Sequence, residues 1–307
     1  MKFGIKLHHS GPGASAGYMK QWAQFAETLG YHLIMTADHI ALTEEVLEEY
    51  PAPYYEPFTN LAWLAAHTER IELGTTVIVV PYRNPLQLAH LASNLDQLSD
   101  GRFIFGVGVG WAKSEFDALG IPFEKRGAIT DDYLSAMEEI WANDVASYQG
   151  EFVSFRDVMV SPKPVQLPHP PVWVGGSSPP ALRRAVRFGN AWHPIGIRTD
   201  WLRNEALPRL VEIAERQGKP VPAISPRIFC RITNQEIPED HRMAGEGTLE
   251  QIHTDLVELS DMGSEYVLFD TKRNNESSNS STHHEEAWQT LAALAETVID
   301  LEGESVR

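Results

Sequence analysis

The strongest constraint on the fold is an alternation that repeats eight times along the chain. Apolar runs of strand length alternate with amphipathic stretches of helix length almost to the C-terminus. The runs predict strands at residues 3–8, 31–37, 71–80, 103–109, 172–175, 191–195, 224–232 and 266–270, and the stretches between them predict helices at 18–29, 58–68, 85–98, 129–141, 179–188, 201–216, 248–262 and 285–301. Residues 104–107 are apolar on both strand faces, which is typical of a parallel sheet covered by helices.

Eight strand–helix pairs in 307 residues predict an α/β fold, a (β/α)8 TIM barrel that forms a single domain over residues 1–307. A doubly wound open sheet of two domains is the competing architecture. It needs a linker near the middle of the chain and a G-x-G-x-x-G fingerprint in the first strand–helix turn. Residues 8–13 read His-His-Ser-Gly-Pro-Gly, and no such linker is present, so the barrel is favoured.

Two segments depart from the alternation. Residues 145–164 contain two short extended runs around a Gln-Gly turn, which predicts a β-hairpin inserted before the fifth strand. Residues 272–284 are rich in Asn and Ser, which predicts a mobile loop after the eighth strand. In a barrel this loop belongs to the C-terminal rim, where active-site loops lie.

The charge balance excludes several classes of partner. The chain has 25 basic and 42 acidic side chains, a net charge of −17, which repels phosphate backbones and anionic lipids. We therefore expect no nucleic-acid or membrane partner. A single cysteine, Cys230, excludes an internal disulfide and a multi-cysteine zinc site. No signal-peptide pattern precedes the first strand, so we expect a cytoplasmic protein.

The end of the second strand carries the best catalytic candidates. Asp38 and His39 place a carboxylate beside an imidazole where the chain leaves the predicted barrel, and histidine can donate or accept a proton near neutral pH. The alternative is that Asp38 caps the next segment and His39 only fills space. No metal site is expected, because H-x-H and H-E-x-x-H patterns are absent.

Three later strand ends suggest a ligand cradle. The third strand brings Gly and Thr residues close to a flat ligand, and Arg83 after it is expected to pair with an acidic neighbour rather than bind an anion. The fourth ends Gly106-Val107-Gly108-Val109-Gly110, which lacks the third glycine of a dinucleotide fingerprint. We expect these alternate glycines to clear one strand face for a ring system.

The fifth strand ends in Gly175, Gly176, Ser177 and Ser178 and opens onto a helix with proline at its start. Free backbone N–H groups at such a helix start can hold a phosphate. The alternative is an ordinary capped turn followed by a solvated basic helix.

Together and in this order, these motifs resemble the bacterial luciferase-like flavin superfamily, and more closely its branch of coenzyme F-420-dependent oxidoreductases. The resemblance covers about residues 3–270. It is carried by Ala37-Asp38-His39, residues 73–77 with 83–85, residues 98–102, residues 106–111 with Glu115-Phe116, residues 126–133, and residues 174–177.

The resemblance implies a barrel that binds a flavin-type ring at its C-terminal mouth and forms a homodimer. It implies that His39 lies near the reactive edge of the ring and exchanges a proton, with Asp38 orienting it. It also implies a non-proline cis peptide between Thr76 and Val77 behind the ring. The implied cofactor-binding residues are Thr75, Thr76, Val77, Gly108, Gly110 and Trp111, with Gly175, Gly176, Ser177 and Ser178 at the phosphate.

Our first hypothesis is an oxidoreductase that moves a hydride between coenzyme F-420 and a small organic substrate. The alternative within the superfamily is an FMN-dependent monooxygenase that uses O2 and reduced FMN from a separate flavin reductase. An alternative of another class is a non-catalytic flavin-binding protein.

Overall fold

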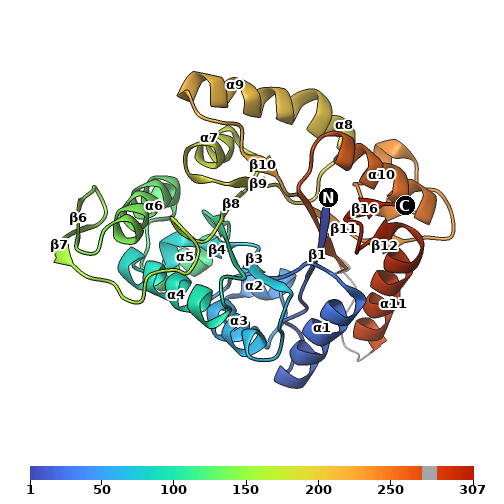
Figure 1. Ribbon diagram of the computed structural model, residues 1–307, viewed down its shortest axis with the longest axis horizontal. Helices are drawn as coiled ribbons and strands as arrows, with labels where there is room; N and C mark the ends of the chain where they lie inside the picture. The colour runs from blue at the N-terminus through green and yellow to red at the C-terminus, as the bar shows by residue number, and fades with distance from the viewer. Residues whose placement is uncertain (272–281) are drawn as a thin grey trace.

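The computed structural model describes residues 1–271 and 282–307 and has a parallel β-sheet at its centre (Figure 1). Neighbouring strands follow the order β10-β9-β8-β5-β3-β2-β1-β14-β11 and all pair in parallel. Apart from β10 and β11, the strands of this order are β1 (Lys2–Lys6), β2 (Leu33–Thr36), β3 (Glu72–Thr75), β5 (Phe103–Gly108), β8 (Val172–Gly175), β9 (Ala191–His193) and β14 (Tyr266–Asp270).

The seventh strand position closes the ring. It is shared by β10 (Ala223–Ile224) and β11 (Arg227–Phe229), which are separated at Pro226 because proline has no N–H for the ladder. On one side the Arg227 N–H donates to Pro194 O at 2.8 Å, and on the other the Leu268 N–H donates to Pro226 O at 2.9 Å. These bonds join β9 to β14 through the shared strand, so the predicted TIM-barrel fold is confirmed.

Helices cover the outside of the ring and follow the strands in sequence (Figure 1). The covering helices are α1 (Ala16–Leu29), α3 (Pro57–Ala65), α4 (Pro85–Leu98), α6 (Arg126–Ala142), α7 (Pro179–Phe188), α8 (Thr199–Trp201) continued by η3 (Leu202–Ala206) and α9 (Leu207–Gln217), α10 (Leu249–Asp261) and α11 (Thr282–Thr297). Local sequence sets their ends: Ser15 caps α1, Gly30 ends it at φ 93°, and Thr248 and Gln251 form a capping box on α10.

Short helices and strands lie in the loops between these main elements. Two helices that the sequence reasoning did not predict, α2 (Glu44–Glu49) and α5 (Lys113–Leu119), follow β2 and β5. The remaining pieces are β4 (Ile78–Val79), β12 (Arg231–Ile232), β13 (Glu246–Gly247), β15 (Ile299–Asp300), β16 (Ser305–Val306), η1 (Val80–Tyr82), η2 (Phe123–Lys125) and η4 (Glu239–His241). The predicted strand 224–232 is therefore three short strands rather than one.

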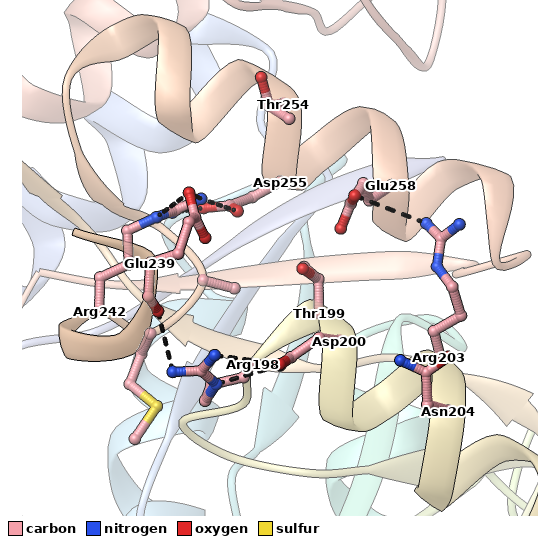
Figure 2. Close-up of a pocket in the computed structure, with 12 residues that line it drawn as sticks. Arg198, Thr199, Asp200, Arg203, Asn204, Glu239, Arg242, Thr254, Asp255 and Glu258 are labelled. Atoms are coloured by element: carbon pink, nitrogen blue, oxygen red, sulfur yellow. Dashed lines mark hydrogen bonds and ion pairs between the residues drawn. The ribbon is translucent and has the colours of Figure 1, made fainter. Parts of the chain in front are cut away.

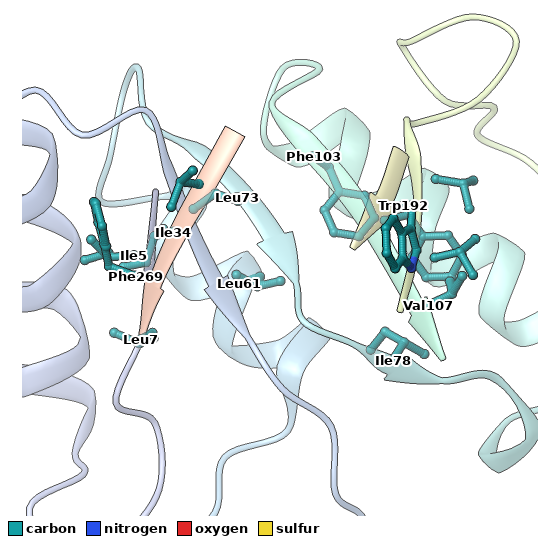
Figure 3. Packing of buried hydrophobic residues seen from close by; sticks show 14 of the residues in the cluster. Ile5, Leu7, Ile34, Leu61, Leu73, Ile78, Phe103, Val107, Trp192 and Phe269 are labelled. Atoms are coloured by element: carbon teal, nitrogen blue, oxygen red, sulfur yellow. The ribbon is translucent and has the colours of Figure 1, made fainter. Parts of the chain in front are cut away.

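Side chains alternate between two buried layers because successive strand residues point to opposite faces. Phe103, Phe105 and Val107 of β5 face outward and pack under the helices, in the layer that Figure 3 shows from close by. The barrel interior is filled by a separate apolar cluster, composed of Leu33, Met35, Ile104, Trp173, Ala191, Tyr266 and Leu268. Towards the carboxyl ends of the strands, the interior positions become polar.

β6 (Ala146–Gln149) and β7 (Ser154–Val158) form a two-stranded antiparallel sheet within the segment where we expect a hairpin. Asp132 of α6 holds it, because its carboxylate accepts hydrogen bonds from the Tyr148 hydroxyl and from the Phe152 N–H. Most of the predicted loop 272–284 lies outside the described residues, and α11 already begins at Thr282. None of the helices in the described ranges is long and apolar enough to cross a membrane.

Candidate active site

A cavity of about 390 Å³ opens at the carboxyl ends of the strands. Its walls come from residues that follow β2, β3, β5, β8, β9, β11 and β14, so most of the barrel contributes to it. This size lies within the range of small-molecule sites. Of the residues predicted from sequence, Asp38, His39, Thr76, Val77, Gly108, Gly110, Trp111, Gly175 and Gly176 line the cavity.

The floor of the cavity is formed by the junction between β3 and β4. The peptide bond between Thr76 and Val77 is cis, as the resemblance implies, and it breaks the predicted strand 71–80 into two pieces. The half-buried Val77 side chain lies against two glycines. A Cβ atom at Gly108 would lie 2.5 Å from Val77 Cγ2, and one at Gly175 would lie 3.0 Å from Val77 Cγ1.

The alternate glycines of β5 have a different role from the one expected. A Cβ atom at Gly106 would lie 1.7 Å from the Thr75 carbonyl oxygen, and one at Gly110 would lie 2.7 Å from Val79 Cγ1. Gly110 also has φ 80°, which disfavours other residues. The glycines therefore make room for residues 75–79 of the neighbouring segment, and Gly108 and Gly110 also line the cavity themselves.

His39 is held by a carboxylate that the sequence reasoning did not assign to it. Its Nδ1 lies 2.8 Å from Glu115 Oε2, and Glu115 is completely buried. The same carboxylate accepts hydrogen bonds from the Ala41 N–H at 2.9 Å and the Tyr82 hydroxyl at 2.9 Å, and a further one from the Ile40 N–H. Glu115 thus ties the loop after β2 to α5, which follows β5.

The hydrogen bonds determine which nitrogen of His39 carries a proton. Burial alone favours the neutral acid, but the bonds from His39 and from the two backbone N–H groups outweigh it and lower the pKa of Glu115. An ionised Glu115 can only accept, so Nδ1 of His39 donates to it. Nε2 is then the nitrogen left on the cavity side, able to accept a proton when neutral and to donate one when charged.

In the described part of the chain no hydrogen bond joins the Asp38 carboxylate to the His39 imidazole, so a direct orienting role for Asp38 finds no support in these contacts. Its carboxylate receives two hydrogen bonds from the Arg83 guanidinium, at 2.6 and 2.9 Å, and a third from the Val79 N–H at 3.0 Å. Burial raises the pKa of the Asp38 carboxyl, and the guanidinium opposes that effect. Arg83 also reaches Glu56 at 3.0 Å, so it pairs with acidic neighbours as predicted.

Aromatic side chains surround the His39 imidazole. The Tyr50 and Tyr54 rings lie with their centroids 4.9 and 5.3 Å from it, and the Trp111 ring lies edge-on at 5.7 Å. Trp111 is 46% exposed at the cavity rim. The Tyr54 hydroxyl is buried and has no hydrogen-bond partner among the described residues. These rings surround His39 with apolar surface, to which the Tyr54 hydroxyl adds one polar group.

A buried polar layer lies at the carboxyl ends of β1, β14 and β11. Arg227 of β11 donates through Nε to Asp270 Oδ2 at 3.0 Å and through Nη1 to the Thr76 carbonyl at 3.3 Å. Lys6 of β1 lies 3.6 Å from the other Asp270 oxygen. His193 has Nε2 2.8 Å from Thr76 Oγ1, and burial lowers the pKa of its imidazole to about 4. His193 is therefore neutral at pH 7, and the ionised groups of this layer are Arg227, Lys6 and Asp270, with Glu49 also on the cavity lining.

Three predicted cofactor residues do not line the cavity. The Thr75 hydroxyl is buried and donates to Gly106 O at 2.7 Å. Ser178 caps α7, accepting a hydrogen bond from the Ala181 N–H at 3.4 Å, and Ser177 beside it is exposed. Only Gly175 and Gly176 of the expected phosphate loop reach the cavity. Gly176 has φ 97°, which turns the chain into the helix start.

A second cavity, of about 430 Å³, lies between the α8 region and α10 (Figure 2). Its arginines pair with carboxylates inside the same pocket: Arg242 with Asp255 at 2.6 and 2.8 Å, Arg198 with Asp200 at 3.0 Å, and Arg203 with Glu258 at 3.8 Å. Although this cavity is the larger of the two, each of its three arginines already pairs with a carboxylate, and the fourth carboxylate, Glu239, also pairs with Arg242. No cluster of three or more metal-ligating side chains occurs in the described part of the chain.

Sequence reasoning missed Glu115, Tyr82, Lys6, Arg227 and Asp270 as site residues. The sequence shows Glu115 as part of a motif that resembles the family. Its partner His39 lies 76 positions away, and only the closed barrel brings the two side chains together. Lys6 and Asp270 end apolar strands, which was a usable signal. Asp270 ends β14 as Asp38 follows β2, at the rim where barrel sites lie.

Known proteins are similar to this chain over most of its length. A family model described as luciferase-like monooxygenase matches residues 1–301. An uncharacterized protein of Mycobacterium tuberculosis is 29% identical over 248 residues, which is 72% of this chain and 86% of that protein. An FMNH2-dependent dimethylsulfone monooxygenase of Pseudomonas putida is 32% identical over 200 residues, covering 62% of this chain and 53% of that enzyme.

Solved structures share the fold. An F-420-dependent secondary alcohol dehydrogenase in complex with an F-420–acetone adduct superposes with a TM-score of 0.77 at 15% identity, over 95% of this chain and 98% of that chain. At this level of identity the likeness concerns the fold alone. What the cavity binds has to be argued from its own residues.

Proposed function

The chain belongs to the luciferase-like monooxygenase family, and from that premise we propose that it is an oxidoreductase that transfers a hydride between coenzyme F-420 and a small organic substrate. The single observation that carries the proposal of an oxidoreductase, with either coenzyme, is the His39–Glu115 pair at the cavity, because it supplies a fixed proton acceptor and donor where the substrate oxygen would lie. A hydride leaves an alcohol only as its hydroxyl proton is also removed.

The cavity suits a flat ring system. Val77 lies against Gly108 and Gly175 at distances that leave no room for side chains there, so these residues form a low apolar surface. The polar residues around it include His39 and Arg227. When bound, such a ring supplies the hydride chemistry, and the protein supplies its orientation and electrostatics.

The site residues then have distinct roles in proton transfer, in positioning and in cofactor binding. His39 Nε2 accepts the proton of a substrate hydroxyl or returns it, while Glu115 stabilises the charged imidazole. Asp38 acts at a distance, because its pair with Arg83 and its bond to the Val79 N–H hold the segment after the cis peptide. Gly175 and Gly176 present backbone N–H groups near the start of α7, where a cofactor phosphate would be held.

An FMN-dependent monooxygenase is the second candidate, and one observation favours it. The relative from Pseudomonas putida is FMNH2-dependent at 32% identity, higher than the identity of the F-420-dependent structural neighbour. In that case a separate flavin reductase would supply reduced FMN. His39 would keep its proton-transfer role in either reaction, so the pair with Glu115 does not discriminate between the two.

Titration of the purified protein with F-420 and with FMN, followed by absorbance and fluorescence, tests the proposal. Tight binding of F-420, and its reduction by an alcohol in a substrate panel, is the expected result. Tight binding of FMN alone, with oxygen consumption in the presence of reduced FMN, would establish the second candidate instead. A protein that binds either coenzyme and turns over no substrate would be a non-catalytic flavin-binding relative.

A further inference from the structure

The oxygen of Glu115 that holds His39 also holds a tyrosine. Glu115 Oε2 lies 2.8 Å from His39 Nδ1 and accepts a hydrogen bond from the Tyr82 hydroxyl at 2.9 Å. The other carboxylate oxygen, Oε1, accepts hydrogen bonds from the backbone N–H groups of Ile40 and Ala41. Two side-chain donors therefore share one anionic oxygen, and one of them is the imidazole that is expected to exchange a proton with the substrate.

The Tyr82 ring is fixed in place beside this oxygen. It is 8% exposed, lines the barrel-mouth cavity and packs edge-on against Phe116, with the ring centroids 5.0 Å apart. Burial and the neighbouring Glu115 carboxylate raise the pKa of the Tyr82 hydroxyl well above its ordinary value, so the hydroxyl stays protonated near neutral pH. Tyr82 is thus a permanent donor to Glu115, whereas the charge on His39 depends on pH.

Other titratable and charged side chains lie around the pair. They are Tyr50 and Tyr54 between α2 and α3, Glu45 on α2, and Arg83 with its partners Asp38 and Glu56, while Glu49, Arg227 and Asp270 line the same cavity. In the part of the chain that the structure describes, His39 and Tyr82 are the two side chains that hydrogen-bond Glu115. A change confined to the Tyr82 hydroxyl therefore acts on His39 through that carboxylate and leaves the other groups in place.

We propose that Tyr82 is a positioning residue that sets the proton affinity of His39 through Glu115. This role rests on the proposed function, in which His39 must both accept and release a proton. The hydroxyl hydrogen of Tyr82 carries partial positive charge and lies against the same oxygen that attracts the charged imidazole. It weakens the hold of Glu115 on the charged form of His39, because two positive groups compete for one buried negative oxygen.

The hydroxyl keeps His39 able to work in both directions. Without it, Glu115 would retain the proton on His39 to higher pH. Alcohol oxidation needs a neutral imidazole that can accept a proton, and carbonyl reduction needs a charged one that can donate it. Loss of the hydroxyl should therefore move the acid limb of the pH–rate profile for oxidation to higher pH. Neutralising Glu115 itself should move it in the opposite direction.

The test is to titrate the His39 ring by NMR from pH 5 to 10, in purified protein with isotope-labelled histidine and no added coenzyme. Tyr82→Phe should raise the midpoint of the His39 titration by about 0.5–1 unit, because it removes a charge-assisted donor from Glu115. Placing 3-fluorotyrosine at position 82 makes the phenol more acidic and a stronger donor, so it should lower the midpoint. Tyr148→Phe is the matched control: its hydroxyl donates to Asp132 at 2.8 Å beside the β6–β7 hairpin, and its loss should leave the midpoint within about 0.2 unit.

A double variant tests whether the effect passes through Glu115. In a Glu115→Gln background, Tyr82→Phe should shift the His39 midpoint by less than about half of its shift in wild type, because the shared acceptor no longer carries a charge. An equal shift in both backgrounds would show that Tyr82 acts on His39 by another route and would overturn its proposed role. Thermal melts identify a variant that fails to fold, and the 3-fluorotyrosine protein, which keeps the side-chain shape, then decides the sign alone.

The results separate the role of Tyr82 from the proposed function. If Tyr82→Phe lowers the midpoint or leaves it unmoved while wild type oxidises an alcohol with either coenzyme, the role of Tyr82 is refuted and the proposed function stands. If the midpoint rises as expected and wild type oxidises no alcohol with either coenzyme, the proposed function fails and Tyr82 still sets the proton affinity of His39. Where both hold, the acid limb of the oxidation profile in Tyr82→Phe should move in the same direction as the NMR midpoint.

Discussion

The cavity at the barrel mouth and the cavity between the α8 region and α10 differ in the features by which a site is recognised. The cavity between the α8 region and α10 is the larger, and its three arginines each pair with a carboxylate of the same pocket (Figure 2). The cavity at the barrel mouth is smaller, but it combines an apolar floor at Val77, an imidazole held by a buried carboxylate, and the buried ion pair of Arg227 with Asp270. Buried ionisable groups beside an apolar surface distinguish a reaction site better than volume does.

The largest expected effect is on turnover at the barrel mouth. His39→Ala should reduce kcat by about 100-fold to 10,000-fold, because it removes the proton acceptor. Coenzyme affinity should stay within a few-fold of wild type, since the ring surface is formed by other residues. Stopped-flow measurement of coenzyme reduction checks this, with Arg203→Ala from the second cavity as the control. Unchanged turnover in His39→Ala would remove this residue from the mechanism.

Glu115→Gln should have the next largest effect, lowering kcat/KM by about tenfold to 100-fold. The amide keeps the shape but no longer stabilises a charged imidazole, so the apparent pKa in the pH–rate profile should move downward. A steady-state pH series from 5 to 9 measures the shift. A uniform loss of activity with an unmoved profile would mean that Glu115 is only structural.

Gly108→Ala should weaken coenzyme binding and cost about 1–3 kcal/mol of stability, because its Cβ would overlap Val77 Cγ2. Gly17→Ala is the control: it lies in α1 with no close contact, and alanine there should be neutral or stabilising by about 0.5–1 kcal/mol. Chemical denaturation and coenzyme titration of both variants test the difference. Equal behaviour of the two glycines would contradict the close packing at Val77.

Acid should destabilise the barrel mouth through its buried histidines. Since the pKa of His193 is about 4 in the folded protein and about 6.5 when unfolded, the unfolded chain binds a proton first as pH falls. Stability is therefore complete above pH 6.5 and declines towards pH 4, by about 2 kcal/mol between pH 7 and 5 from this residue. His193→Gln should lose that part of the pH dependence, whereas exposed His241→Gln should keep it. Equal slopes in urea denaturation would refute the assignment.

The smallest expected effect is in the second cavity. Arg198→Ala removes a solvent-exposed pair with Asp200, so neither the melting temperature nor kcat/KM should change measurably. Differential scanning calorimetry and a steady-state assay check this. A clear loss of activity would make the second cavity part of the site and erase the contrast between the two regions.

Much of the fold could be predicted because local signals set the element ends. Helices 85–98 and 179–188 and strands 172–175 and 266–270 agree residue for residue with the structure. Proline at the first helical position, with Asn84 or Ser178 as the N-cap, fixes where the two helices begin. The helices α2 and α5 were not predicted, because seven residues or fewer carry too little periodicity.

The site was only partly predictable because its partners come from distant strands. Asp38 and His39 were found as neighbours in sequence, yet each pairs with a residue from another loop: Asp38 with Arg83 and His39 with Glu115. The alternate glycines of β5 were noticed, but their true neighbour, the segment 75–79, follows only from strand pairing. The positions of the motifs along the sequence therefore indicate where the site lies, whereas the closure of the barrel determines which side chains form pairs.

A crystal structure of the protein soaked with F-420 or FMN tests the central claim most directly. We expect density for the ring at the barrel mouth, with one face against Val77 and one edge within hydrogen-bonding reach of His39. A ring bound in the cavity between the α8 region and α10, or a barrel mouth that excludes both coenzymes, would contradict it.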